Sequence, residues 1–172
     1  MSDLTVKPLT PALGADFLRF FDHERGAAFA DNPEWAKCYC HFYQVPQAID
    51  WPALTASQNR TAMQARIEVG AMDGFLALDG ADAVGWLNAQ PRDALPHCFD
   101  RMRIEPTPLP CEAFEAAVIV CFVVAPQRRR QGIARVLLAA DHYHGSLSLF
   151  LDQGFTVLRE DETMTVVRKI LR

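Results

Sequence analysis

The longest apolar stretch of the chain covers residues 116–124, which read AAVIVCFVV. Because this run is continuous and rich in β-branched side chains, it predicts a central strand that is buried on both faces. Further along, apolar residues recur at helical spacing, at Ile133, Val136, Leu137 and Ala140. That spacing predicts an amphipathic helix over residues 130–143 that packs its apolar face on the sheet.

Short regular elements precede this strand. In chain order we expect a strand at 4–7, a helix at 11–21, an irregular segment at 22–52 and a helix at 55–69. Thr55 and Ser57 are alternative N-caps for the second helix, and Gly70 is its stop. Residues 75–89 predict a hairpin, with strands at 75–78 and 83–89 around a turn at Asp79 and Gly80.

The remaining segments complete an α+β fold. Residues 91–112 contain five prolines and predict a long loop, and SLSLFLDQ (146–153) predicts a short helix that ends at Gly154. The last two strands are expected at 155–158 and 163–170. A chain of 172 residues suits a single domain, residues 1–172. The order of elements predicts a three-layer arrangement in which helices flank a mixed, mostly antiparallel sheet.

Composition excludes several functional classes. The formal net charge is -4, so the chain as a whole lacks the positive excess that favours nucleic acid. No apolar run reaches the roughly 18 residues that a membrane helix needs, and the N-terminus lacks a signal-peptide core. Five cysteines, an odd number, do not suggest a secreted disulfide framework. We therefore expect a cytoplasmic protein with reduced thiols that binds neither membranes nor nucleic acid.

The most informative chemistry lies where the apolar strand gives way to the helix, in CFVVAPQRRRQGIA (121–134). Pro126 cannot donate to a sheet ladder, so the strand ends near Ala125. The first N–H groups of the following helix have no partner within it, and the helix dipole places partial positive charge there. Gly132 has no side chain, so an anion can approach the backbone closely. Together with Arg128–Arg130, this corner predicts a phosphate or diphosphate site.

Three other interpretations of the same residues remain open. The arginines at 128–130 are also typical of a solvated run of charge. They would also suit a nucleic-acid patch, although no companion basic or aromatic stripe accompanies them. Gly132 would also suit a helix that packs closely on the sheet.

The pattern Val124-x-Pro126-x-x-Arg129-x-x-Gly132-x-Ala134, between a buried strand and an amphipathic helix, resembles the acetyl-CoA-binding signature of the GNAT superfamily of N-acetyltransferases. LFLDQGF (149–155) resembles the element that opens the last strands of these enzymes. YHGS (143–146) and CYC (38–40) resemble blocks in related sequences. The resemblance covers nearly the whole chain and implies the GNAT fold, in which the central pair of strands splays apart.

The resemblance also implies acetyl-CoA as co-substrate and an amine of a small molecule or peptide as acceptor, acetylated by direct attack in a ternary complex. The backbone of Phe122, Val123 and Val124 would bind the pantetheine arm, and an amide there would polarise the thioester. The other implied cofactor-binding residues are Arg129, Arg130, Gln131, Gly132, Ile133 and Ala134 for the pyrophosphate, and Tyr143 for pantetheine. A homodimer is compatible with this family.

The chain departs from the family pattern where protons must move. Phe150 stands where many members place a tyrosine acid, and the strand lacks the glutamate that serves others as base. Glu115 and His144 are therefore the candidate catalytic residues, with an exposed carboxylate and a surface histidine as the alternative interpretations. A non-catalytic CoA-binding regulatory module is the alternative function. Cys121 would permit an acyl-cysteine route, but burial in an apolar strand is expected to make it inert.

A strand that the family places between its last two helices has no counterpart between Ala140 and Gly145. Either this strand is deleted or the sequence omits residues at this place. We favour the second alternative, because deletion would remove one wall of the cofactor slot. An intact mass above 19.2 kDa would support it, and a mass of 19.2 kDa would contradict it.

The irregular segment carries Cys38-Tyr39-Cys40-His41 and a set of aromatic residues. A structural zinc site needs a second ligand cluster, which the spacing of Cys98 and Cys111 does not provide, so we predict no metal. Strand-like alternation would instead point Cys38 and Cys40 to one buried face. The resemblance implies that this region walls the acceptor pocket, whereas core packing would explain the aromatic residues equally well. The implied lining consists of Trp35, Tyr39, Phe42, Tyr43 and Trp51.

Overall fold

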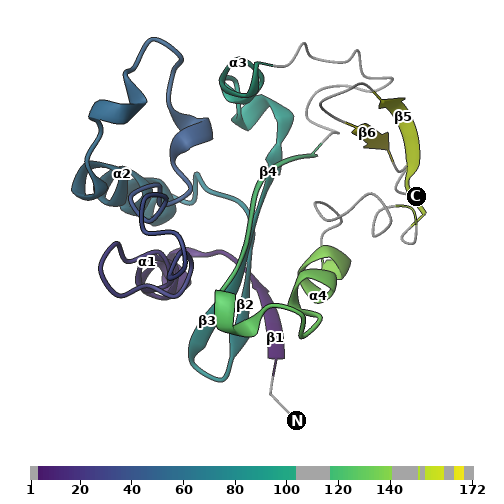
Figure 1. Cartoon of the computed structure of the whole chain (residues 1–172). Helices are drawn as coiled ribbons and strands as arrows, with labels where there is room; N and C mark the ends of the chain where they lie inside the picture. Colours follow the sequence, from purple (N-terminus) through teal and green to yellow (C-terminus); the bar gives the residue numbers. More distant parts are fainter. Residues whose placement is uncertain (1–3, 104–116, 141–150, 152–153, 161–164, 169–172) are drawn as a thin grey trace.

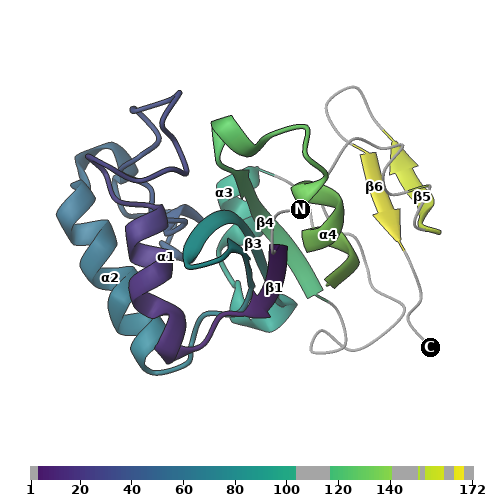
Figure 2. The same cartoon turned by 90° about the horizontal axis from the view of Figure 1, so that it is seen from below.

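Four antiparallel strands form the main sheet, in the spatial order β1-β2-β3-β4 (Figure 1). The computed structural model describes residues 4–103, 117–140, 151, 154–160 and 165–168. The strands are β1 (Leu4–Pro8), β2 (Phe75–Asp79), β3 (Asp82–Pro91) and β4 (Ala117–Val124). Helices α1 (Gly14–Phe20) and α2 (Ala56–Glu68) lie on one side of this sheet and α4 (Ile133–Ala140) on the other (Figures 1 and 2). The predicted α+β class with a mostly antiparallel sheet is confirmed.

Both predicted helices of the N-terminal half are present, with small differences at their ends. A 3₁₀ turn at Pro11–Leu13 leads into α1. At α2, Thr55 Oγ1 accepts a hydrogen bond from the Gln58 N–H at 3.2 Å, and Gln58 Oε1 accepts one from the Thr55 N–H at 2.9 Å. This reciprocal capping box satisfies N–H groups that the helix itself leaves free. Thr55, rather than Ser57, is therefore the N-cap.

The predicted hairpin is also confirmed, although its second strand is longer than expected. β2 and β3 pair from Asp79 and Asp82 outward, so that the loop between them contains only Gly80 and Ala81. Gly80 has a φ of 62°, a conformation that favours glycine. β3 continues to Pro91, two residues beyond the predicted end.

Side chains on the two faces of the sheet enter two hydrophobic clusters. On the α1 side, Phe17 packs its ring edge to face against Trp86, with 4.9 Å between centroids. On the α4 side, Leu87 packs with Ile133 and Leu137. All five side chains are fully buried, and burial of a large apolar side chain contributes about 1.5–3 kcal/mol relative to exposure. Packing on both faces thus fixes the sheet between the helices.

β4 is less buried than its apolar sequence predicts. Ile119, Val120 and Val123 are buried, whereas Cys121 and Phe122 are only half-buried. In the part of the chain that the structure describes, β4 is paired with a strand on one side only, namely β3. The expectation of a strand buried on both faces is therefore wrong, because Cys121 on the pocket face and Phe122 on the α4 face both stay half-buried.

Part of the segment predicted as a long loop is helical. A 3₁₀ turn at Arg92–Ala94 follows β3, and helix α3 spans Cys98–Met102. Leu95 and Cys98 are fully buried and anchor this segment. The prolines suggested a loop, but these two apolar side chains find a place in the core. Residues 104–112 of the predicted loop lie outside the described residues.

The last two strands, β5 (Thr156–Glu160) and β6 (Thr165–Arg168), form a separate antiparallel pair. Gly154, the predicted stop of the short helix, has a φ of 81°. Apart from Leu151, the predicted short helix falls outside the described residues, as does the segment between Ala140 and Gly145. The splayed strand pair implied by the family resemblance therefore stays a prediction.

Candidate functional site

The strand-to-helix corner follows directly from the end of β4. The Ala125 N–H still donates to the Val84 carbonyl at 3.0 Å, and Pro126–Arg128 then form a 3₁₀ turn. Arg130 has a φ of 62° and Gly132 a φ of 80°, so the backbone turns twice through the left-handed region. α4 starts at Ile133, three residues later than predicted, because a residue with positive φ cannot continue into a right-handed helix.

Gly132 is required for its backbone conformation rather than for close packing. A side chain at this position would meet no atom within 4 Å. The first bond of α4 runs from the Val136 N–H to the Gly132 carbonyl, at 3.1 Å. The N–H groups of the residues between Gly132 and Val136 therefore lie before the first internal hydrogen bond of α4. The interpretation of Gly132 as a packing residue is wrong, and the space in front of it is open.

The three arginines at the corner differ in their partners. Arg128 forms an ion pair with Asp79, with 2.5 Å between Nη1 and Oδ2. Arg129 binds both carboxylate oxygens of Asp31 and donates from Nε to the Val124 carbonyl at 3.3 Å. Arg130 has neither an ion pair nor a hydrogen bond with any described residue. We expected Arg129 or Arg130 to contact a phosphate, and of these two only Arg130 has no polar partner within the described part of the chain.

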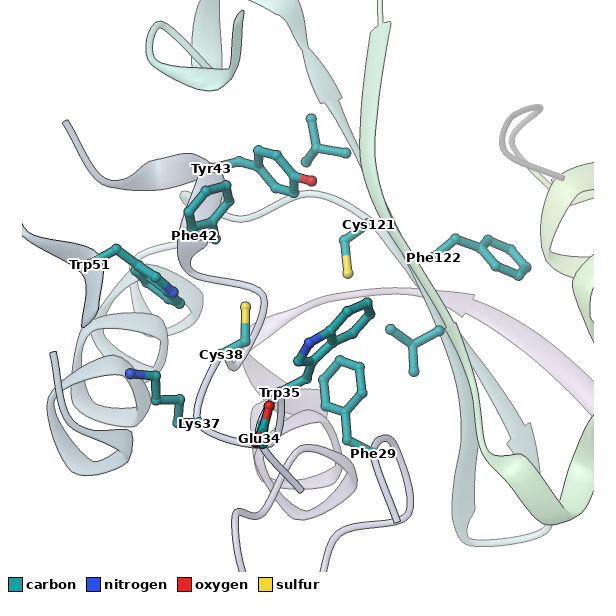
Figure 3. Close-up of a pocket in the computed structure, with 12 residues that line it drawn as sticks. Phe29, Glu34, Trp35, Lys37, Cys38, Phe42, Tyr43, Trp51, Cys121 and Phe122 are labelled. Atoms are coloured by element: carbon teal, nitrogen blue, oxygen red, sulfur yellow. The ribbon is translucent and has the colours of Figure 1, made fainter. Parts of the chain in front are cut away.

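A pocket of about 490 Å³ lies against β4 on the side of α1 and α2. Figure 3 shows Phe42, Tyr43 and Trp51 on one side of it and Trp35 with Phe29 on another, with Cys38 and Cys121 between them. The ring of Phe122 points to the opposite side of β4, toward α4 (Figure 3). Among the described residues, the lining consists of Phe29, Glu34, Trp35, Lys37, Cys38, Phe42, Tyr43, Trp51, Val120, Cys121, Phe122 and Val123.

Four of the five predicted lining aromatics therefore face this pocket. Tyr39 is the exception, because it is buried in the core and its hydroxyl accepts a hydrogen bond from the His23 N–H at 2.9 Å. The predicted strand-like alternation of Cys38 and Cys40 is also wrong. Tyr39 and Cys40 have φ values of 47° and 58°, which form a tight turn that buries Cys40 and leaves Cys38 at the pocket.

Side-chain bonds to backbone carbonyls hold the irregular wall of the pocket in place. Arg101 of α3 donates to the carbonyls of Val45, at 2.9 Å, and Ile49, at 2.9 Å, as well as to that of Pro46. Its guanidinium also lies over the Phe42 ring, 5.3 Å from the centroid. On the other part of the wall, Lys37 donates to the Pro52 carbonyl at 3.1 Å. These bonds replace the ladder that a strand or helix would supply.

The pocket environment favours the neutral forms of its titratable groups. Burial raises the pKa of Cys38 to about 11, and burial raises the pKa of Tyr43 to about 12. Behind the lining, burial lowers the pKa of His41, although its hydrogen bond with Asn59 opposes this shift. These groups therefore keep the pocket uncharged near neutral pH, apart from Glu34 and Lys37.

A buried polar network lies behind the pocket, and the sequence patterns described above did not predict it. Trp86 Nε1 and Asn88 Nδ2 donate to Cys40 Sγ at 3.2 and 3.1 Å, and Gln90 Nε2 donates to Asn88 Oδ1 at 2.7 Å. The signal was the WLNAQ stretch, in which two amides stand at alternate positions of an otherwise apolar strand. Such amides require buried partners, and here the partner comes from the irregular segment.

Several predicted site residues cannot be placed. Glu115, His144 and Tyr143 lie outside the described residues, so their roles stay predictions. Phe122, Val123 and Val124 lie on β4, and Arg129–Ala134 form the corner at its end. Within the described ranges, no group of three or more histidine, cysteine or acidic residues is arranged to hold a metal ion.

The fold and the site define a three-layer α+β protein with a cationic corner and an aromatic pocket on one strand. No protein-family model, curated protein or solved structure matches the chain. None of the described helices has the length and apolar character that crossing a membrane requires.

Proposed function

We propose that the chain is an acetyl-CoA-dependent N-acetyltransferase. The observation that carries this proposal is the position of two complementary sites on β4, namely the cationic corner at its end and the aromatic pocket against its side. An acyl donor that bears phosphates would bind at the corner and present its thioester beside the pocket. Holding donor and acceptor next to each other is itself a large part of catalysis in such transfers.

The corner fits the phosphate part of the donor. Among the described residues, none fills the space in front of Gly132 and none pairs with Arg130, and the first N–H groups of α4 precede its internal hydrogen bonds. The Val124 carbonyl accepts from Arg129 rather than from β3, so it faces the outer edge of the strand. Backbone groups on that edge would bind an amide-containing arm in the manner of an added strand.

The pocket fits an amine acceptor with an apolar or aromatic body. Its walls are mainly rings, which would contact such a body and would also attract an ammonium group through their faces. Glu34 is exposed at the pocket and supplies a carboxylate for the same group. In the reaction the amine nitrogen would attack the thioester carbon and a C–N bond would form as the C–S bond breaks. The proton that the nitrogen loses balances the one that the departing thiolate takes up, giving an amide and free CoA thiol.

The test combines calorimetry with an assay for released CoA thiol. Wild-type protein is expected to bind acetyl-CoA and to release thiol only with some members of a panel of aliphatic and aromatic amines. Trp35→Ala should raise KM for the amine and leave CoA binding unchanged, because 61% of Trp35 is exposed and its ring faces the pocket. CoA binding without turnover across the panel would instead indicate the regulatory module.

Gly132→Val and Gly70→Val form a matched pair for the cofactor assignment. Both glycines have a positive φ and open space around them, so both variants carry the same backbone strain, about 1–2 kcal/mol. Gly70 lies after α2, away from the corner. Only Gly132→Val should weaken CoA binding, and equal CoA affinity in the two variants would refute the proposed corner.

A further inference from the structure

Cys40 is a buried sulfur toward which nitrogen donors converge. The Trp86 Nε1–H group donates to Cys40 Sγ, with 3.2 Å between nitrogen and sulfur, and an indole nitrogen can act only as a donor. Asn88 Nδ2, at 3.1 Å, is oriented by the Gln90 amide, which donates to the Asn88 oxygen at 2.7 Å. Trp86, Asn88 and Cys40 are all fully buried. Two buried N–H groups therefore depend on one sulfur atom for their hydrogen bonds.

Cys121 lies beside the same sulfur. It packs against the cluster that contains Cys40, and on the sheet it is the direct cross-strand neighbour of Asn88, whose amide donates to Cys40 Sγ. Unlike Cys40, Cys121 is half-buried and lines the pocket. The pair thus connects a sulfur that small molecules in the pocket can reach with one that the protein core surrounds.

This arrangement favours one negative charge shared by the two sulfurs. A neutral thiol is a weak hydrogen-bond acceptor, whereas a thiolate is a strong one. Burial raises the pKa of Cys40, but the bonds from Cys121, Asn88 and Trp86 outweigh burial and lower it. As the donor of the pair, Cys121 has its pKa raised by the bond to Cys40 and by burial. The two groups titrate together, and the first proton that the pair loses leaves the negative charge on Cys40, the group whose pKa is lowered.

We propose that Cys40 and Cys121 form a redox-active pair that a hydroperoxide entering the aromatic pocket oxidises to a disulfide. The proposal stands on the packing of Cys121 beside Cys40 and Asn88, the N–H donors that converge on Cys40 and the access to Cys121 through the pocket. It does not depend on the proposed acetyltransferase activity.

The reaction balances with the hydroperoxide as the oxidant. Cys121 passes its proton to Cys40 and attacks one peroxide oxygen, so that an S–O bond forms, the O–O bond breaks and the released hydroxide takes a proton from solvent. Cys40 then gives up its proton and attacks the Cys121 sulfur, forming the S–S bond. The departing hydroxide takes that proton and leaves as water. Two cysteines lose two electrons, and one hydrogen peroxide becomes two waters.

The disulfide would join two parts of the chain that lie far apart in sequence. Cys40 sits in the tight turn of the pocket wall, and Cys121 sits on β4. Crosslinking them would fasten this wall to the sheet and change the lining of the pocket, since Cys121 belongs to that lining. Cys38 provides an internal comparison, because it lines the same pocket but burial raises its pKa to about 11.

The experiment treats the native, reduced full chain with one equivalent of hydrogen peroxide and then alkylates the remaining thiols. We expect the loss of two hydrogen masses, two fewer alkylated cysteines, and a crosslinked peptide that contains Cys40 and Cys121 after non-reducing digestion. Dithiothreitol should reverse the change. A different cysteine pair, oxidation of Cys38 alone, or a disulfide that forms only in the unfolded chain would overturn the proposal. The mapping uses the unmodified chain, so it does not depend on whether a variant folds.

Variants separate the roles of the individual groups. Cys38→Ser should leave the rate of disulfide formation unchanged, whereas Cys121→Ser should abolish the disulfide. Trp86→Phe keeps the ring but removes one N–H donor to the thiolate, so the rate at neutral pH should fall roughly tenfold or more, and its pH profile should shift to higher pH. An unchanged rate and profile in Trp86→Phe would overturn the inference that the N–H donors sustain the thiolate.

Discussion

The two faces of the main sheet are built in different ways. Toward α4 the sheet is densely packed, because Gly85 of β3 leaves room for Leu137 and Ile133 to approach the backbone. Toward the other side, aromatic residues surround an open space of about 490 Å³. The main sheet therefore carries a dry interface with α4 on one face and an open aromatic pocket on the other.

This difference assigns separate tasks to the two sides. The packed side fixes α4, and with it the corner at Gly132, by apolar contacts. The pocket side is held mainly by bonds from Arg101 and Lys37 to backbone carbonyls of the irregular wall. Apolar packing resists displacement, whereas an irregular wall tied by a few polar bonds can adjust. We therefore expect substitutions on the packed side to affect stability most.

The largest effect is expected from Leu137→Ala. Leu137 is fully buried between α4 and the sheet, so the substitution should lower the free energy of unfolding by about 2–5 kcal/mol. Val136→Ala is the control on the same helix, because Val136 is 40% exposed and should cost less than about 0.5 kcal/mol. Urea unfolding followed by circular dichroism measures both. Equal losses would contradict the packed interface.

Gly85→Ala tests the same interface by adding an atom. The new Cβ would lie 2.9 Å from Leu137 Cδ1 and 3.0 Å from Ile133 Cγ2, so the helix must move and stability should fall by about 1–3 kcal/mol. In the Leu137→Ala background much of this clash disappears. The double mutant should therefore be more stable than the sum of the two losses predicts, and simple additivity would argue against this contact.

The sequence predicts the packed side well because its pattern follows from the period of the elements. Ile133, Val136, Leu137 and Ala140 indicated α4, and the turn at Asp79 and Gly80 between two strand-like segments indicated the hairpin. The Thr55 cap was predicted together with Ser57, and the reciprocal bond with Gln58 decides between them. Local preferences and long-range packing agree in these segments, so sequence reasoning succeeds.

On the pocket side, the sequence indicated which kinds of residue form the wall but not how the backbone arranges them. The aromatic residues of 35–51 suggested a lining, but the positive φ values at Tyr39 and Cys40 have no local sequence signal. They depend on partners that are distant in sequence, such as Trp86 and Asn88 at the Cys40 sulfur. At the corner, the pairing of Arg129 with Asp31 is equally non-local. Motif reasoning located the corner but could not assign partners to its arginines.

Arg101→Lys tests the stability of the pocket wall. A lysine retains the charge but loses the fork that contacts the carbonyls around 45–49, so the free energy of unfolding should fall by roughly 1–2 kcal/mol. Arg60→Lys is the matched control, because Arg60 is exposed on α2 and bonds only Gln64 among the described residues. The wall should also become more accessible to proteolysis in Arg101→Lys alone. Identical behaviour of the two variants would refute this role.

The smallest effect on stability is expected at the link between the two sides, the ion pair of Asp31 with Arg129. Asp31 belongs to the irregular segment and Arg129 to the corner, and both side chains are about half exposed. Such a pair contributes at most about 1 kcal/mol, so Asp31→Asn should leave the unfolding curve nearly unchanged.

Binding should respond differently from stability if the corner holds phosphates. Asp31→Asn removes a negative charge and releases the Arg129 guanidinium, so calorimetry should find CoA bound roughly two- to fivefold more tightly, a gain of less than about 1 kcal/mol. Asp16→Asn is the control, because Asp16 pairs with Arg19 on α1, away from the corner. Weaker CoA binding in Asp31→Asn would mean that the ion pair organises the corner for the ligand. Tighter binding would mean that Asp31 competes with the ligand for Arg129, and that the pocket wall and the corner act on each other through this contact.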